Sequence, residues 1–417
     1  MSQRKTGGRP RTGTDTRIAR RAFLAGTSAA AFTIVRPAQV RGTEANSTIT
    51  LGLLGCGGRG TWIVPLFQQH GRYRLVACAD YYPDRLEAAG QKFEVPENRR
   101  YAGLSGYKKL LEDKLDAVVI ETPPYFHPEQ AAAAVDAGKH VYLAKPVAVD
   151  VPGCRSIAES GRKATERKLA FLVDFQTRAD AGYRELARRL HGGMLGKMVS
   201  GDAKYPTGHL GMTAPQSPED RLRYWYCVKA LSGDFIVEQS IHALDVATWF
   251  LDAAPVRCWA RGGSRGLRTY GDIWDYFQVL FEFPNDFPLT FHCVQNVHGS
   301  PNEIRCRIYG EKATVDSDYF SGLWWRGQDA SLNLEADFKK SYGDVGLYTG
   351  GTIVNIREYY ECITGGRFDN PTVAPSVRSN LTAIMARDAA YSGEPLTWEA
   401  LMKSDARLEP DLKGLKA

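Results

Sequence analysis

The sequence predicts an α/β protein whose N-terminal part is a parallel sheet covered by helices, and whose C-terminal part is an α/β region with a large, open, mostly antiparallel sheet. Between residues 46 and 175, short apolar runs alternate with helix-like segments, which is typical of a sheet buried on both faces. Beyond residue 175, longer runs alternate apolar and polar residues, as antiparallel strands with one exposed face do. A glycine-rich turn follows the first apolar run.

The elements of the first part follow from the spacing of its apolar runs. Short runs rich in β-branched residues predict strands, and Ala-rich or amphipathic segments between them predict helices. The expected strands are 47–55, 73–80, 115–122, 140–144 and 169–175, and the expected helices are 62–70, 83–92 and 127–138.

The second part has a different pattern. Its expected strands are 276–283, 289–297 and 304–309, and two late helices are expected near 353–364 and 377–391. The aromatic stretch 205–231 fits neither pattern, and long loops of this kind are usually functional. The chain therefore divides into a leader at 1–45, a first domain at 46–175 and a second domain at 176–417, whose last helices are expected to pack back on the first.

Residues 1–45 have the three regions of an export signal. A basic segment leads to Arg20-Arg21, then Phe23-Leu24, and then a weakly apolar run at 25–35. These regions resemble a twin-arginine signal, which predicts export of the folded protein to the periplasm. The run is too short to cross a bilayer, which needs about 20 residues, so no stable membrane span is expected. The alternative is a basic tail ahead of a cytosolic enzyme.

The formal charge of +6 belongs to this leader. Residues 1–45 hold nine basic and two acidic residues, so the rest of the chain has 44 basic and 45 acidic residues and a net charge of −1. A body without positive excess cannot hold a polyanion by charge. We therefore expect no nucleic-acid partner.

Cysteine and histidine spacings exclude two further classes. The eight cysteines are scattered without a CxxC pair, and the histidines show no metal-ligand spacing. This is neither a disulfide framework nor a zinc site. We predict buried free thiols and no metal.

The glycine-rich turn GCGGRG at 55–60 lies between an expected strand and an expected helix. In that context it predicts a Rossmann-type dinucleotide site, with phosphates at the helix N-terminus. Asp80 ends the second strand, where a carboxylate accepts hydrogen bonds from a ribose diol and favours NAD over NADP. Arg59 and Arg85 keep NADP open as an alternative. The residues expected to contact the cofactor here are Gly55, Gly57, Gly58, Arg59, Gly60 and Asp80.

Three further motifs follow in order. They are Thr122-Pro123 with His127, Gly138-Lys139-His140, and Lys145-Pro146. Together they resemble the glucose–fructose oxidoreductase and inositol dehydrogenase family, Gfo/Idh/MocA, and the likeness runs from about residue 48 to 400.

This resemblance implies that Thr122, Pro123 and His127 belong to the cofactor site. It also implies that Lys145 lies near the nicotinamide and the reacting hydroxyl, where a lysine with a lowered pKa can pass a proton. One departure is Ala144, since the family has Glu before this lysine.

After Gly233, the segment 234–245 is predicted to be a helix. Glu238 and His242 are then four residues apart on one face, with Asp245 three residues further. A carboxylate beside an imidazole fixes its tautomer and raises its basicity, so Glu238 is expected to orient His242, with Asp245 supporting the same face. The resemblance implies that His242 is the general base. The alternative is a polar helix face with a satisfied histidine.

Candidate substrate residues lie outside these motifs. Arg178 resembles a family position near the substrate, although a surface salt bridge is its ordinary alternative. Tyr205-Pro206-Thr207 with His209 is similar to a branch that hydrolyses glycosides through transient oxidation, although a solvated loop is equally compatible. Trp225 can offer a flat face to a sugar ring, and its alternative is core packing.

The resemblance implies hydride transfer between a sugar, glycoside or polyol hydroxyl and a tightly bound nicotinamide cofactor. The second domain is then the substrate-binding and oligomerisation domain of a homo-oligomer, a dimer or tetramer. One alternative is a redox-neutral NAD-dependent glycosidase that acts by transient oxidation and elimination. Another is a non-catalytic ligand-binding protein on the same scaffold, against which Lys145, Glu238 and His242 argue.

Overall fold

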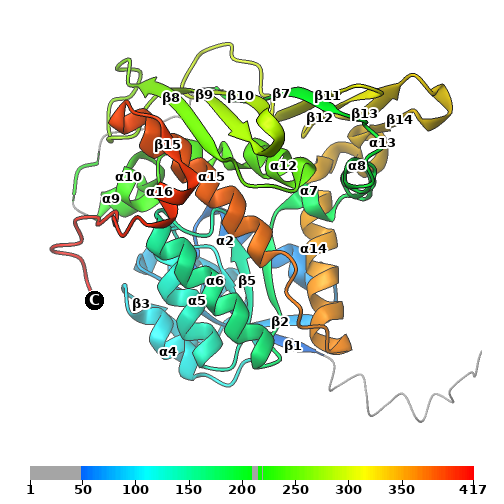
Figure 1. The fold of residues 1–417 in the computed structure, drawn as a ribbon. Coiled ribbons are helices and arrows are strands. Elements are labelled where there is room, and N and C mark those ends of the chain that lie inside the picture. The colour runs from blue at the N-terminus through cyan, green and yellow to red at the C-terminus, as the bar shows by residue number, and fades with distance from the viewer. Residues whose placement is uncertain (1–47, 209–214, 218) are drawn as a thin grey trace, which may run out of the picture. The chain divides into compact units, whose positions relative to one another are not determined.

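A six-stranded parallel sheet forms the first part of the protein (Figure 1). The computed structural model describes residues 48–208, 215–217 and 219–417, so the predicted leader lies outside the described residues. The strands are β1 (Ile49–Leu54), β2 (Tyr73–Asp80), β3 (Arg100–Ala102), β4 (Ala117–Ile120), β5 (His140–Ala144) and β6 (Phe171–Asp174). Their order is β3-β2-β1-β4-β5-β6, which is the Rossmann order with a crossover between β1 and β4. This confirms the predicted fold class of the first part.

Helices connect these strands. They are α2 (Gly58–Gln69), α3 (Pro83–Lys92), α4 (Gly106–Glu112), α5 (His127–Asp136) and α6 (Val151–Glu166), with a 3-10 turn η1 (Glu97–Arg99). The strands β2 and β5 and the helix α3 have the predicted bounds. α3 begins with Pro83, whose fixed φ suits the first helical turn.

A nine-stranded sheet forms the second part. Its strands are β7 (Met198–Pro206), β8 (Arg257–Gly263), β9 (Tyr276–Phe283), β10 (Phe287–Val294), β11 (Arg305–Gly310), β12 (Ala313–Asp318), β13 (Gly322–Gly327), β14 (Leu334–Asp337) and β15 (Leu396–Thr397). The order is β14-β13-β12-β11-β7-β10-β9-β8-β15, and only β7 and β10 pair in parallel. Buried and exposed residues alternate along β9 and β10, so one face of the sheet packs on helices and the other is open, as predicted.

The helices of the second part are shorter on average. They are α7 (Gln176–Ala179), α8 (Ala181–His191), α9 (Asp220–Arg223), α10 (Lys229–Ser232), α11 (Phe235–Glu238), α12 (Ile241–Leu251), α13 (Phe338–Tyr342), α14 (Gly346–Gly365), α15 (Val373–Ser392) and α16 (Trp398–Met402). The 3-10 turns are η2 (Trp225–Cys227), η3 (Pro284–Asp286), η4 (Ala330–Leu332) and η5 (Gly343–Val345). The stretch 205–231, expected to be irregular, therefore contains α9, η2 and α10.

The long helices α14 and α15 contact both parts. α15 packs on α6 and on β8, and α14 packs on α2 and β6. The Tyr73 hydroxyl donates to the Ile356 carbonyl at 3.0 Å, and one hydrophobic core cluster includes residues from both sheets. No helix within the described part of the chain is long and apolar enough to cross a membrane.

Candidate active site

The glycine-rich loop joins β1 to α2. Gly55 has φ +93°, and a Cβ there would lie 2.7 Å from the Glu121 carbonyl oxygen. A Cβ on Gly60 would lie 1.9 Å from the Gly55 carbonyl oxygen, whereas nothing lies within 4 Å of one on Gly58. Gly55 and Gly60 are thus required for close backbone packing, and Gly58 leaves open space at the N-terminus of α2. A dinucleotide phosphate fits this space, because the first N–H groups of a helix have no partner within the helix.

A cavity of about 300 Å³ lies beside this loop. Of the residues predicted from sequence to contact the cofactor, those that line this cavity are Gly55, Gly57, Gly58, Arg59, Asp80, Thr122 and Pro123. The Asp80 carboxylate accepts the Cys56 N–H at 2.7 Å and the Tyr82 N–H at 2.8 Å. Each oxygen can accept a further hydrogen bond, so the predicted contact of Asp80 with a ribose diol is compatible with this geometry and stays a prediction.

The second part of the chain closes this cavity. Leu222, Arg223, Trp225 and Tyr226, from α9 and η2, line it together with Tyr82. Trp225 also packs in a small apolar cluster with Tyr82 and Leu222. Trp225 was predicted to contact the substrate, but it lines the cofactor cavity. Sequence spacing could not indicate this position.

His127 was predicted to contact the cofactor, but it does not line the cavity. It makes hydrogen bonds to the loop after β4 and to the loop after β5. It is 1% exposed, and its ring nitrogens lie 2.8 Å from the Thr122 carbonyl oxygen and 2.8 Å from the Pro146 carbonyl oxygen. The Thr122 hydroxyl donates to Gln130 at 2.6 Å. His127 thus fixes the position of Lys145-Pro146 relative to Thr122-Pro123.

Lys145 follows β5 and is held by Glu238. Its Nζ donates to the Glu238 carbonyl oxygen at 2.5 Å and lies 3.7 Å from the Glu238 carboxylate. Burial lowers the pKa of Lys145, and Glu238 opposes this shift. An ammonium with a lowered pKa can give up its proton more readily than an exposed lysine.

His242 lies in an aromatic pocket. The centroid of its ring is 5.9 Å from that of Phe175 and 5.5 Å from that of Tyr319. Burial, followed by the nearby charges of Lys145 and Arg59, lowers the pKa of His242 well below its ordinary value. The imidazole is therefore neutral and able to accept a proton.

The predicted Glu238–His242 pair is not formed. The segment 233–245 is two helices, since α11 ends at Glu238 and α12 begins at Ile241. Between them the Ser240 N–H donates five residues back and the His242 N–H three residues back, so the spacing of a continuous helix is lost. The Glu238 carboxylate pairs with Lys145, and His242 Nδ1 has no hydrogen-bond partner within the described residues.

Asp245 and Arg178 bind each other. The Arg178 guanidinium donates to both Asp245 oxygens at 2.8–3.1 Å, and the Ser379 hydroxyl donates to Asp245 at 2.6 Å. The Asp245 side chain is 0% exposed and that of Arg178 is 10% exposed. Asp245 therefore does not support His242, and the charge of Arg178 is already neutralised, so a substrate role for Arg178 finds no support in this geometry.

Tyr205 lies near the end of β7 and is half-buried. Burial raises the pKa of Tyr205, and the Glu238 carboxylate adds to this effect. His209 lies outside the described residues.

Two carboxylates were missed from the sequence. Glu121 follows β4, Asp174 ends β6, and both are 0% exposed. Arg59 reaches from the glycine-rich loop to both, hydrogen bonding Asp174 and lying 3.5 Å from Glu121. The sequence held one indication of their role: each carboxylate stands at the end of an apolar strand, and the carboxyl ends of parallel strands meet at one edge of a sheet.

No group of three or more His, Cys, Asp and Glu side chains suited to a metal ion occurs in the described ranges. All eight cysteines are free thiols, and seven are buried.

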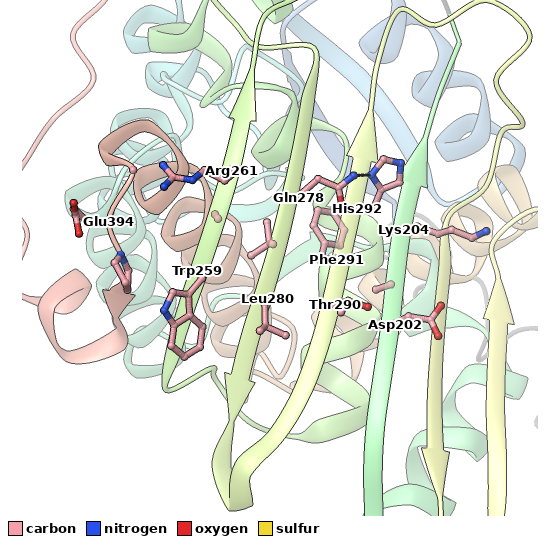
Figure 2. A pocket seen from close by; sticks show the side chains of 15 residues that line it. Asp202, Lys204, Trp259, Arg261, Gln278, Leu280, Thr290, Phe291, His292 and Glu394 are labelled. Carbon is pink, nitrogen blue, oxygen red and sulfur yellow. Dashed lines mark hydrogen bonds between the residues drawn. The ribbon is translucent and has the colours of Figure 1, made fainter.

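Another concavity lies on the open face of the second sheet (Figure 2). It has a volume of about 510 Å³ and contains none of the predicted site residues. Trp259 and Leu280 are 39% and 41% exposed there, and Gln278 contacts His292.

The fold and the cavity define a dinucleotide-binding oxidoreductase. Residues 49–173 match the model of an oxidoreductase family with an NAD-binding Rossmann fold, and residues 183–316 match the Gfo/Idh/MocA C-terminal domain. The chain belongs to the Gfo/Idh/MocA family of NAD-dependent oxidoreductases.

Several known proteins are similar. An inositol 2-dehydrogenase of Acidothermus cellulolyticus is 26% identical over 280 residues, which cover 64% of this chain and 72% of that protein. The structure of an aldose-aldose oxidoreductase from Caulobacter crescentus, complexed with glycerol, has a TM-score of 0.67 at 21% identity. That of a levoglucosan dehydrogenase with NADH and levoglucosan has a TM-score of 0.69 at 17% identity. Each match covers 84% of this chain and 99% of the other, and at these identities both show the fold.

Proposed function

We propose that this enzyme transfers a hydride between a hydroxyl of a sugar, glycoside or polyol and a tightly held NAD, and that it works outside the cytosol. One observation carries the proposal: Lys145 is held after β5 with its Nζ 3.7 Å from the carboxylate of Glu238, four residues before the buried His242. Burial lowers the pKa of both Lys145 and His242. The relatives named above act on inositol, aldoses and levoglucosan, which favours a cyclic polyol or sugar.

Each residue has a defined part in this proposal. The glycine-rich loop, Asp80 and Thr122 hold the dinucleotide, whose nicotinamide accepts or returns a hydride when bound. His242 takes the proton of the reacting hydroxyl at its neutral imidazole. Lys145 donates a hydrogen bond to the same oxygen, and Glu238 holds the lysine in place.

Retention of the cofactor is supported by the cover on the cavity. α9 and η2, the cover, supply four residues to the wall of the cavity. Residues 403–417, the tail, run beside α9 (Figure 1). Asp411 lies 3.1 Å from Arg221 of α9, and the Lys416 carbonyl accepts the Leu104 N–H at 3.2 Å. Leu412 and Leu415 pack against the same apolar cluster as Trp225. A ligand enclosed by these segments leaves slowly.

Export through the twin-arginine route is the second half of the proposal. It rests on Arg20-Arg21 and the apolar run after them. Replacing both arginines by lysine should keep the protein in the cytosol. Cell fractionation tests this, and unchanged periplasmic recovery would remove the export part alone.

A homo-oligomer is proposed through the open sheet face in Figure 2. The exposed Trp259 and Leu280 on neighbouring strands suit a second copy of this chain. Light scattering of a Trp259→Glu variant should show a smaller species than the unmodified protein.

The first experiment is mass spectrometry of what the purified, buffer-exchanged protein releases on denaturation. Stoichiometric NAD or NADH supports a captive cofactor, and polyols and sugars are then screened for reduction of the bound cofactor. Release of free sugar from a glycoside without net NADH would instead indicate the redox-neutral glycosidase. A protein that neither releases nor binds nicotinamide would refute the proposal.

A further inference from the structure

Three strand ends lie in a row at the carboxyl edge of the first sheet. β5 lies between β4 and β6, and the register places Ile120 beside Leu143 and Ala144 beside Asp174. Glu121, one residue after Ile120, is therefore level with Ala144 and Asp174. Side chains at one level of a parallel sheet point to the same face. The methyl group of Ala144 leaves room between the two carboxylates, and the Arg59 guanidinium bridges them.

The two carboxylates are not equivalent. Asp174 accepts hydrogen bonds from Arg59, from Gln176 at 3.2 Å and from Asn355 at 2.8 Å. Neither oxygen of Glu121 has a hydrogen-bond partner within the described residues, although its side chain is 0% exposed. Asp174 is thus the structural partner of Arg59. Glu121 shares its cation, Arg59 at 3.5 Å, with Asp174, and a buried carboxylate whose charge is incompletely compensated is costly.

The charged side chains around Glu121, with Glu121 itself, carry one more negative charge than positive charges. Lys145 pairs with Glu238, and Arg59 pairs with Asp174. The tyrosines that also face this cluster, Tyr142 and Tyr348, are neutral hydroxyls whose pKa values burial raises. Burial raises the pKa of Glu121 to about 7, and Arg59 and Lys145 oppose this shift. A cation beside Glu121 would complete the balance.

The cofactor supplies such a cation in one of its two redox states. Glu121 and Arg59 line the cofactor cavity, and Glu121 follows β4, across the β1–β4 crossover from Asp80 at the end of β2. A dinucleotide lies across this crossover in a Rossmann sheet, so the nicotinamide half is expected on the Glu121 side when Asp80 holds the adenosine ribose. The oxidised nicotinamide ring carries a positive charge and the reduced ring carries none. Water does not screen charges in a buried site as it does at the surface.

We propose that Glu121 is the counter-charge of the oxidised nicotinamide, so that it stabilises bound NAD⁺ over bound NADH and sets the redox balance of the held cofactor. The inference depends on the proposed function only for NAD occupying this cavity. Glu121 acts electrostatically on the ring and takes no part in proton transfer.

The test compares the affinities of both redox forms for protein stripped of its cofactor. At pH 8, Glu121→Gln should weaken NAD⁺ binding about tenfold, the equivalent of one pKa unit, and leave NADH binding within about twofold. Asp84→Asn is the matched control, because Asp84 pairs with Arg223 of the cover at 2.9 Å and its neutralisation should leave the NAD⁺/NADH ratio unchanged. Equal weakening of both forms by Glu121→Gln, or no weakening, overturns the proposal.

A pH titration of the unmodified protein gives a second test that needs no variant. NAD⁺ favours ionised Glu121, so its affinity should rise about tenfold as pH increases through about 7, while NADH affinity stays flat. In Glu121→Gln the NAD⁺ curve should lose this step. The counter-charge role is contradicted if NADH affinity shows a step of the same size, or if the step in NAD⁺ affinity persists in Glu121→Gln. Failure of the unmodified protein to bind either form would refute the proposed function instead.

Discussion

The two ends of the cofactor cavity hold their charged groups in different ways. At the adenosine end, Asp80 is fixed by two backbone N–H groups, one of them only two residues away. At the nicotinamide end, Arg59 reaches Asp174 over 115 positions of sequence, and Asn355 reaches the same carboxylate over 181. The first end depends on local backbone geometry, and the second on side chains that only the complete fold brings together.

This difference implies that the two ends respond differently to substitution. A change at the adenosine end should alter which cofactor binds and how tightly. A change at the nicotinamide end should alter proton transfer or stability, because each side chain there is the partner of another from a distant element.

The largest expected effect is that of His242→Asn at the nicotinamide end. Loss of a general base lowers turnover by about 10²–10⁴-fold, and NAD binding should be retained because His242 is absent from the cavity lining. Steady-state turnover and NAD titration measure both effects.

Glu238→Gln distinguishes the observed Lys145–Glu238 pair from the expected Glu238–His242 pair. Glu238 raises the pKa of Lys145 against the lowering caused by burial. Neutralising Glu238 should therefore lower the pKa of Lys145, and the part of the pH–rate profile that reports this pKa should move to lower pH. A loss as large as that of His242→Asn, with an unshifted profile, would instead favour a Glu238–His242 pair.

The same contrast explains what could be predicted from sequence. The parallel sheet, the glycine-rich turn and the place of Asp80 follow from local patterns, and β2, α3 and β5 have their predicted bounds. The break between Glu238 and Ile241 does not, because it depends on hydrogen bonds that Ser240 and His242 make to carbonyls five and three residues back. Arg178 with Asp245, and Trp225 in the cofactor wall, are long-range contacts that one sequence does not reveal.

A second substitution tests whether Arg178 is structural. Arg178→Ala leaves the 0% exposed Asp245 without its cation, which should lower the free energy of unfolding by about 3–5 kcal/mol. Arg184→Ala is the control, since Arg184 and Glu358 form a more exposed pair and exposed pairs contribute about 0–1 kcal/mol. Chemical denaturation measures both. A raised KM with unchanged stability would restore the substrate role of Arg178.

At the adenosine end, Asp80→Ala should change cofactor preference. It removes the acceptor for a ribose diol, and hydrogen bonds to charged groups contribute about 1.5–3 kcal/mol, so NAD affinity should fall about 10–100-fold. The affinity for NADP should fall less, because Arg85 lines the same cavity and can pair with a 2′-phosphate. Titration with both cofactors measures the ratio. Adding Arg85→Ala should remove the relative gain for NADP, and an unchanged ratio in Asp80→Ala would show that Asp80 does not select the cofactor.

The smallest effect is expected where the tail holds the cover. Leu412→Ala with Leu415→Ala should weaken packing on the cluster with Trp225 by about 1 kcal/mol in total, because both leucines are only partly buried. That corresponds to about fivefold faster release of NADH, measured by fluorescence after mixing with excess NAD. Lys413→Ala, an exposed change in the same tail, is the control and should leave release unchanged. Equal release rates in all three proteins would mean that the cover holds the cofactor without help from the tail.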